Sequence, residues 1–149
     1  MALRQLRFYD DDILRKKCKF VDLIDDKIRQ ILNDMADTMY KEHGGGLAAP
    51  QIGILKRLVV VDMGQGLIKL VNPTIIQKEG IQEVVEGCLS IPNILGKLKR
   101  PQKVMVHAFN EIGEEIILTG QGDLAKCYCH EIDHLEGILF TDLVTEYIR

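Results

Sequence analysis

The feature that most constrains this chain is a helical segment with two histidines four residues apart. Residues 127–137 read CYCHEIDHLEG, so His130, Glu131 and His134 form the pattern HExxH. Residues four apart share one face of a helix, and both imidazoles can therefore bind one metal ion. Glu131 lies about 100° further round, where it can reach a water on that metal and act as a general base or acid. The pattern predicts a metal-dependent hydrolase.

The opposite face of the same helix is apolar. At about 100° per residue, four apolar side chains lie roughly 120° to 200° from His130. They are Leu124, Tyr128, Ile132 and Leu135. This stripe can pack against a core while the histidines face a cleft, which weighs against the alternative of a solvated helix that carries HExxH by chance.

A catalytic metal site usually has three protein ligands, so a third must be found. Cys127 faces the histidine side but lies roughly 7.5 Å along the axis from the midpoint of the two histidines, too far for a metal–sulfur bond of about 2.3 Å. Cys129 faces about 100° away from His130. We interpret both cysteines as small buried packing residues. The residues alone leave the third ligand open among Cys18, His43, Cys88, His107 and a carboxylate.

Two protease classes would complete the site differently. The pattern HExxHxxGxxH continues to Gly137 but ends at Phe140, which cannot bind metal. A glutamate ligand well downstream has little room, because only Glu136 and Glu146 follow before the chain ends at residue 149. Both classes are disfavoured, and a small HExxH metalloprotease remains the alternative function.

The order of predicted elements favours an α+β fold, with mostly antiparallel β-sheets packed around the HExxH helix and an N-terminal helix. Apolar residues from Ile24 to Met39 recur at helical spacing, and Asp25 or Asp26 can cap the start. This helix is expected to end before the segment HGGG, where glycine permits a turn. The length suits one domain over residues 1–149.

Between the two helices the sequence predicts strands. Those expected are 57–63, 67–80 and 81–87, and a hairpin over 103–120 turns near 110–113. The second helix is expected from near Gly122 to about Gly137. Helix, strands and helix in this order disfavour alternating βαβ units.

Charge and hydropathy restrict the partners and the compartment. The formal net charge of −3 gives no electrostatic case for binding nucleic acid or an anionic membrane. No apolar run approaches the roughly 20 residues that span a bilayer, and the start MALRQLRFYDDD does not resemble a signal peptide. We expect a cytoplasmic protein whose four cysteines bind metal or are buried, without disulfides.

Three separated segments resemble the peptide deformylase family. They are GGGLAAPQIG (44–53), EGCLS (86–90) and HEIDHLEG (130–137), in the family's order and spacing, and DDILRKKCKFV (11–21) is a weaker match. The resemblance implies an enzyme that removes the N-formyl group from the N-terminal formylmethionine of new polypeptides and releases formate. A catalytically degenerate relative that only binds peptides is the non-enzymatic alternative.

The resemblance also implies the metal ligands and the cofactor. Cys88, His130 and His134 would bind one divalent ion, Fe(II) as the native metal, with Zn, Ni or Co able to replace it. The implied partners are N-formylmethionyl peptides, as nascent chains at the ribosome, and a monomeric protein is expected.

The same resemblance implies catalytic and substrate-binding residues. Glu131 would transfer the proton, while the Gln51 amide and the backbone N–H of Leu89 would polarise the formyl oxygen. Substrate-binding residues would be Gly44, Gly45, Gly46, Glu86 and Gly87.

Several positions depart from the family's usual pattern. Gly45 replaces a large aliphatic residue, Leu95 an arginine that helps bind substrate, and Cys129 a glutamine. The candidates for the methionine-pocket wall include Asp123, Lys126 and Cys127. Asp123 can instead be a helix N-cap, and Lys126 can send its amine to water.

Three charged residues are candidates for supporting the ligands. Glu86 and Arg100 are expected to form an ion pair that braces the Cys88 loop, with an ordinary surface pair as the alternative. Asp133 is expected either to orient a ligand imidazole or to be solvated.

Overall fold

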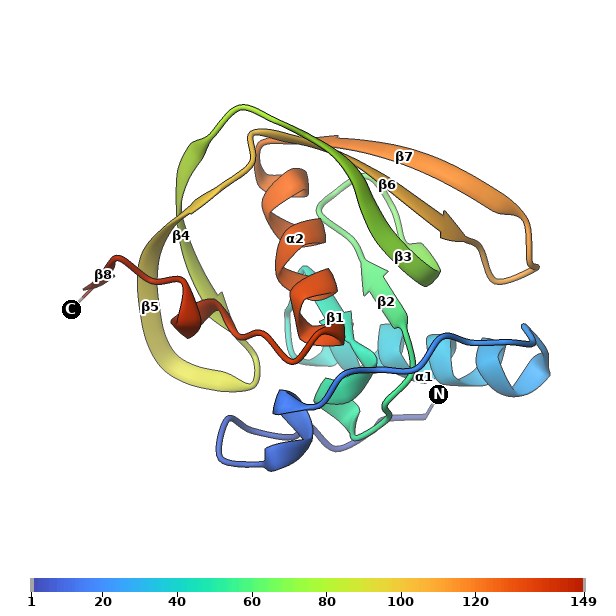
Figure 1. Cartoon of the computed structure of the whole chain (residues 1–149). Coiled ribbons are helices and arrows are strands. Elements are labelled where there is room, and N and C mark those ends of the chain that lie inside the picture. The colour runs from blue at the N-terminus through green and yellow to red at the C-terminus, as the bar shows by residue number, and fades with distance from the viewer. Residues whose placement is uncertain (1, 149) are drawn as a thin grey trace.

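The HExxH helix runs through the middle of the molecule, with β-sheets on either side of it (Figure 1). The computed structural model describes residues 2–148. This helix is α2 (Asp123–Leu135), and the N-terminal helix is α1 (Asp26–Lys41). The strands are β1 (Gly46–Ala48), β2 (Leu58–Val61), β3 (Ile68–Glu79), β4 (Gln82–Cys88), β5 (Ile91–Arg100), β6 (Lys103–Phe109), β7 (Glu115–Gln121) and β8 (Glu146–Ile148). Short 3-10 helices span Asp12–Arg15, Ala49–Ile52 and Phe140–Asp142.

The strands form two antiparallel sheets. One has five strands in the order β1-β2-β3-β6-β7, and the other has three in the order β4-β5-β8. Every pairing within them is antiparallel. The predicted α+β class with a central HExxH helix is therefore confirmed.

The five-stranded sheet is covered on both faces because β2 alternates between two cores. Val59 and Val61 pack in one buried cluster with α2. Leu58 and Val60 pack in another with α1. The predicted apolar stripe of α2 lies in the first cluster, where Tyr128, Ile132 and Leu135 are buried and Leu124 packs against them. The helix thus packs against the five-stranded sheet on one side, and its histidines face Glu86 and Cys88 of β4 on the other.

The helix starts were predicted with mixed success. Asp25 caps α1, since its carboxylate accepts the backbone N–H of Ile28 at 3.1 Å. The N-cap of α2 is Gly122, at φ 60°, and it has no side-chain cap. The expectation that Asp123 is an N-cap is therefore wrong, because the chain enters α2 through a left-handed turn that favours glycine.

Within residues 2–148, no helix is both long enough and apolar enough to cross a membrane.

Candidate metal centre and active site

Cys88 and the two histidines come together from segments that are far apart in the sequence. Cys88 is the last residue of β4, and His130 and His134 lie on consecutive turns of α2. One ligand atom from each lies within 4.8 Å of the others. Among the described residues this is the one group of three or more potential metal ligands. The other candidates, Cys18, His43 and His107, are not part of it.

The donor set fits a divalent metal ion. The Cys88 Sγ and His134 Nε2 atoms are 3.4 Å apart. Sulfur and nitrogen ligands bound at about 2.3 and 2.0 Å to one tetrahedral ion lie about 3.5 Å apart. Two imidazoles and one thiolate suit zinc, iron, nickel or cobalt, and three protein ligands leave a position for water.

A hydrogen bond at Nδ1 fixes the orientation of the His130 ring. Its Nδ1 atom lies 2.7 Å from the Glu86 carboxylate. A carboxylate only accepts hydrogen bonds, so Nδ1 carries a proton and Nε2 is the nitrogen left to bind a metal.

Glu86 is itself held by Arg100, as the sequence suggested. Arg100 donates two hydrogen bonds to the Glu86 carboxylate, at 2.7 and 2.9 Å, and both side chains are buried. The surface-pair alternative is therefore wrong. Arg100 donates a third hydrogen bond to Asp133 at 2.6 Å. Asp133 thus reaches His130 only through Arg100 and Glu86, and the expectation that it orients an imidazole directly is corrected.

This arrangement keeps Glu86 ionised. Burial raises the pKa of Glu86, but the hydrogen bonds from Arg100 and His130 outweigh burial and lower the pKa to about 2. Because its oxygens are already engaged, the Glu86 side chain supports a ligand, although Glu86 also borders the pocket.

Glu131 is buried beside the two histidines and has a perturbed pKa. Its side chain is buried, and its Oε1 atom has no hydrogen-bond partner. Burial raises the pKa of Glu131 to about 7, against the opposing effect of the His130 charge. Gly46 provides the space, because a Cβ at that position would lie 2.7 Å from Glu131 Oε2.

Gln51 presents its amide nitrogen to the same centre. Its Oε1 atom accepts the backbone N–H of Ala48 at 2.9 Å, which fixes the amide orientation. Its Nε2 atom then lies 3.1 Å from Ser90 Oγ and 3.6 Å from Cys88 Sγ. The sequence did not indicate Ser90 as a partner, because a serine after a strand carries no distinguishing pattern.

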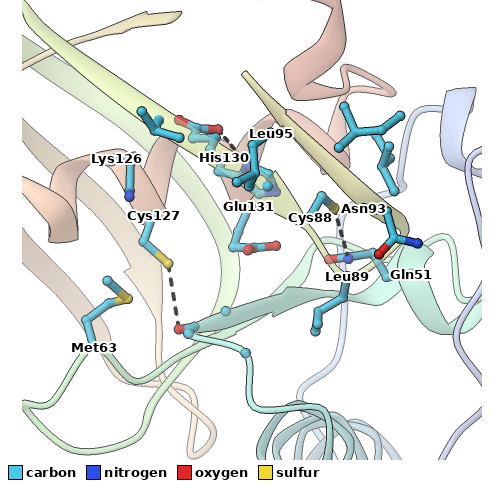
Figure 2. A pocket seen from close by; sticks show the side chains of 18 residues that line it. Gln51, Met63, Cys88, Leu89, Asn93, Leu95, Lys126, Cys127, His130 and Glu131 are labelled. Carbon is cyan, nitrogen blue, oxygen red and sulfur yellow. Dashed lines mark hydrogen bonds and ion pairs between the residues drawn. The ribbon is translucent and has the colours of Figure 1, made fainter. Parts of the chain in front are cut away.

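A cavity of about 560 Å³ opens beside these residues. Figure 2 shows Gln51 and Leu89 on one side of Glu131, and Met63, Cys127 and Lys126 on the other. Its lining contains the expected substrate-binding residues and two of the three expected wall residues. They are Gly44, Gly45, Gly46, Glu86, Gly87, Lys126 and Cys127. Asp123 does not line it: its side chain is 80% exposed on the first turn of α2, so this expectation is wrong. Met63 also lines the cavity and was not predicted.

The two cysteines upstream of His130 are buried, as expected. Burial raises the pKa of Cys129 to about 11 and that of Cys127 well above its ordinary value. Neither belongs to the metal-ligand group. The Cys127 thiol instead lies 3.7 Å from the Gly45 carbonyl oxygen, to which it donates.

The sequence and the fold both match known proteins. Residues 3–148 match the family model described as polypeptide deformylase. The chain is 69% identical over its full length to the whole of peptide deformylase 2 from Clostridium acetobutylicum. A peptide deformylase structure from Legionella pneumophila is 43% identical, with a TM-score of 0.94 over 97% of this chain and 87% of that one. A peptide deformylase from Synechococcus elongatus, in complex with actinonin, is 42% identical, with a TM-score of 0.93 over 96% and 79%.

The chain belongs to the polypeptide deformylase family. Deformylases are metal-dependent hydrolases that remove the formyl group from N-terminal formylmethionine. The predicted family, enzyme class and reaction are therefore confirmed for this chain.

The three positions identified from the sequence as unusual for the family, Gly45, Leu95 and Cys129, lie in two places in this deformylase. Leu95 lines the cavity and is 49% exposed, and Gly45 lines it beside Met63. Cys129 is buried in the cluster between α2 and the five-stranded sheet. Leu95 and Gly45 thus border the cavity, whereas Cys129 contributes to packing.

Proposed function

We propose that this deformylase holds one divalent metal ion through Cys88, His130 and His134. The support is the 3.4 Å separation of Cys88 Sγ and His134 Nε2, together with the Nδ1 hydrogen bond to Glu86, which leaves Nε2 as the nitrogen of His130 that can bind the metal. An ion bound there supplies Lewis-acid activation, which makes water a nucleophile at neutral pH.

Glu131 is proposed to take the proton of the attacking water and deliver it to the leaving amine. A carboxylate with a pKa of about 7 can do both near neutral pH. Its unpartnered oxygen supports this role, since no protein group competes for it.

Gln51 and Leu89 are proposed to stabilise the oxyanion that forms at the formyl oxygen. The Gln51 amide is held in one orientation by Ala48 and directs its N–H groups toward Cys88 and Ser90. Leu89 follows Cys88 directly, so its backbone N–H lies next to a ligand. Donors fixed before the reaction stabilise developing charge without reorganisation.

We propose Fe(II) as the native metal, with Zn, Ni or Co as substitutes. The support is the mixed nitrogen and sulfur donor set, which accepts all four ions. Iron beside a thiolate is sensitive to oxygen, so iron-loaded protein should lose activity in air as the iron or Cys88 is oxidised. Nickel-loaded protein should keep its activity, and equal decay of both forms would argue against iron chemistry as the cause.

We further propose that the substrates are nascent chains at the ribosome, in the cytoplasm, and that the protein acts as a monomer. Formylated nascent peptides are the substrates of this family, which supports the first part. Light scattering at working concentration tests the second, and a mass of twice 16.9 kDa would contradict it.

The experiment that tests the ligand assignment is metal analysis of three variants. Cys88→Ala, His130→Ala and His134→Ala should each lose most of the bound metal after dialysis, while wild-type protein keeps about one ion per chain. Cys127→Ala is the matched control and should keep the metal, because Cys127 lies outside the ligand group. Metal loss in the control but not in Cys88→Ala would overturn the assignment.

A further inference from the structure

Met63 occupies the space that a side chain at position 45 would fill. A Cβ built on Gly45 would lie 2.5 Å from the Met63 sulfur, a distance that real Cβ atoms do not show. The next nearest atoms are 3.9 Å away, so Met63 alone closes this space. The backbone of Gly45 is not in the left-handed region. Glycine therefore leaves room here for the Met63 side chain in its present position, and the backbone conformation does not require it.

The chain around Met63 is fastened to the strand that carries Gly45. β1 and β2 pair through Gly46 and Val61, and the Asp62 N–H donates to the Gly45 carbonyl at 2.9 Å. The Asp62 carboxylate accepts the Tyr40 hydroxyl at 2.6 Å and the Gly64 N–H at 3.0 Å. The segment between β2 and β3 therefore starts from a fixed point, and Met63 is the first residue after it.

The Met63 side chain faces the part of the cavity that the first residue of the substrate must occupy. Glu131 and Cys127 lie four residues apart on α2, about 6 Å along the axis. A Cβ on Gly46 would lie 2.7 Å from Glu131 Oε2 and 2.9 Å from Cys127 Sγ, so these side chains border one space. The first side chain begins two bonds from the scissile nitrogen, and an extended methionine side chain spans about one helical turn. A first side chain that extends from Glu131 toward Cys127 therefore reaches the side of the cavity on which Met63 lies (Figure 2).

We propose that Met63 is the residue that determines which first side chain this deformylase accepts. It lines the cavity from the segment after β2 and occupies the space that a side chain at position 45 would fill. A methionine side chain is unbranched and adaptable, so it suits straight apolar side chains such as methionine or norleucine. This inference rests on the proposed function, because it assigns a specificity role within that reaction.

The test compares two substrates across a mutant cycle. Formate release is measured with formyl-Met-Ala-Ser and formyl-Phe-Ala-Ser for wild type, Met63→Ala, Gly45→Ala and the double variant. Met63→Ala should lower kcat/KM for the methionine peptide about tenfold, through loss of apolar contact. It should leave the phenylalanine peptide unchanged or improved, since the pocket becomes wider.

Gly45→Ala tests the steric relation directly. In wild type the new methyl group displaces the Met63 side chain, so kcat/KM for the methionine peptide should fall at least threefold. In Met63→Ala the same change should cause no further fall, because the space is open. Met105→Ala is the matched control: it truncates a half-buried methionine on β6 that does not line the cavity, and it should leave the substrate ratio unchanged.

The outcomes separate this inference from the proposed function. An active wild type whose Met63→Ala variant keeps the same ratio between the two substrates would overturn the inference alone. Equal effects of Gly45→Ala in both backgrounds would also overturn it. A metal-loaded wild type that releases no formate from either peptide would overturn the proposed function as well.

Discussion

The Glu86 carboxylate lies 2.7 Å from His130 Nδ1 and accepts two hydrogen bonds from Arg100, so a buried ion pair sets the orientation of the His130 ring, a proposed metal ligand. The connection runs from β4 through Arg100 on β5 to α2. The three-stranded sheet is thereby coupled through charged groups to the face of α2 that carries the proposed metal ligands.

Glu86→Gln should weaken metal binding by about 10- to 100-fold. Glutamine keeps the size of the side chain but lacks the charge that orients the imidazole and raises its basicity. Affinity is measured by competition with a chromophoric chelator. Glu83→Gln, an exposed change on the same strand, is the control and should keep the wild-type affinity. If the two variants bind metal equally tightly, Glu86 has no supporting role.

The lowered pKa of Glu86 predicts that the free energy of unfolding decreases at acidic pH. The pKa of Glu86 is 4.5 in the unfolded chain and about 2 in the folded protein. The ionised Glu86 therefore makes its full contribution to the free energy of unfolding above about pH 5.5, and this contribution is lost as the pH falls toward 2. Between pH 6 and pH 3 the metal-free wild type should lose roughly 2 kcal/mol of unfolding free energy from this group. Urea unfolding at both pH values checks this. The Glu86→Gln variant should lose about 2 kcal/mol less unfolding free energy than wild type over this pH range. If it loses as much as wild type, the ionisation of Glu86 does not contribute to the pH dependence of stability.

Gly46→Ala should abolish most activity without removing the metal. The new Cβ would lie 2.7 Å from Glu131 Oε2 and 2.9 Å from Cys127 Sγ, both in a buried region. Glu131 must then move, and proton transfer is sensitive to such displacement, so kcat should fall by about 100-fold. Steady-state kinetics and metal analysis on the same sample provide the check. Normal kcat would mean that the site adapts to the methyl group.

Lys126→Leu should improve the enzyme's use of methionine peptides. The amine lines the cavity and has only a distant partner, Asp123, at 3.9 Å. Filling the cavity with an apolar side chain removes water from this amine, which is unfavourable. We expect KM for formyl-Met-Ala-Ser to fall about threefold with little change in kcat. Lys27→Leu on α1 serves as the control, and an unchanged KM in Lys126→Leu would mean that the amine already lies in water.

The sequence predicted the elements that carry strong periodicity. Helices α1 and α2, the strands β2, β3 and β4, and the hairpin β6–β7 all appear close to their expected residues. Strand β5 was not predicted, because its exposed positions interrupt any apolar alternation and it contains Pro92 and Gly96. The sheet pairs it with β4 and β8, a tertiary effect that overrides local preference.

The site was predictable only where residues are close in sequence. HExxH spacing identified His130, Glu131 and His134, which lie on one helix. Cys88 could be assigned only through the family resemblance, because it lies on strand β4, far from this helix in the sequence. Met63 has no sequence signal at all, because its role depends on its contact with Gly45.

The central claim is that a metal at Cys88, His130 and His134 and the carboxylate of Glu131 together perform deformylation. The most direct measurement is formate release from formyl-Met-Ala-Ser by anaerobically purified wild type and Glu131→Gln, each with its metal content determined. We expect both proteins to hold about one ion per chain and Glu131→Gln to be slower by about 100-fold or more. Metal-loaded Glu131→Gln that releases formate at the wild-type rate would contradict the claim.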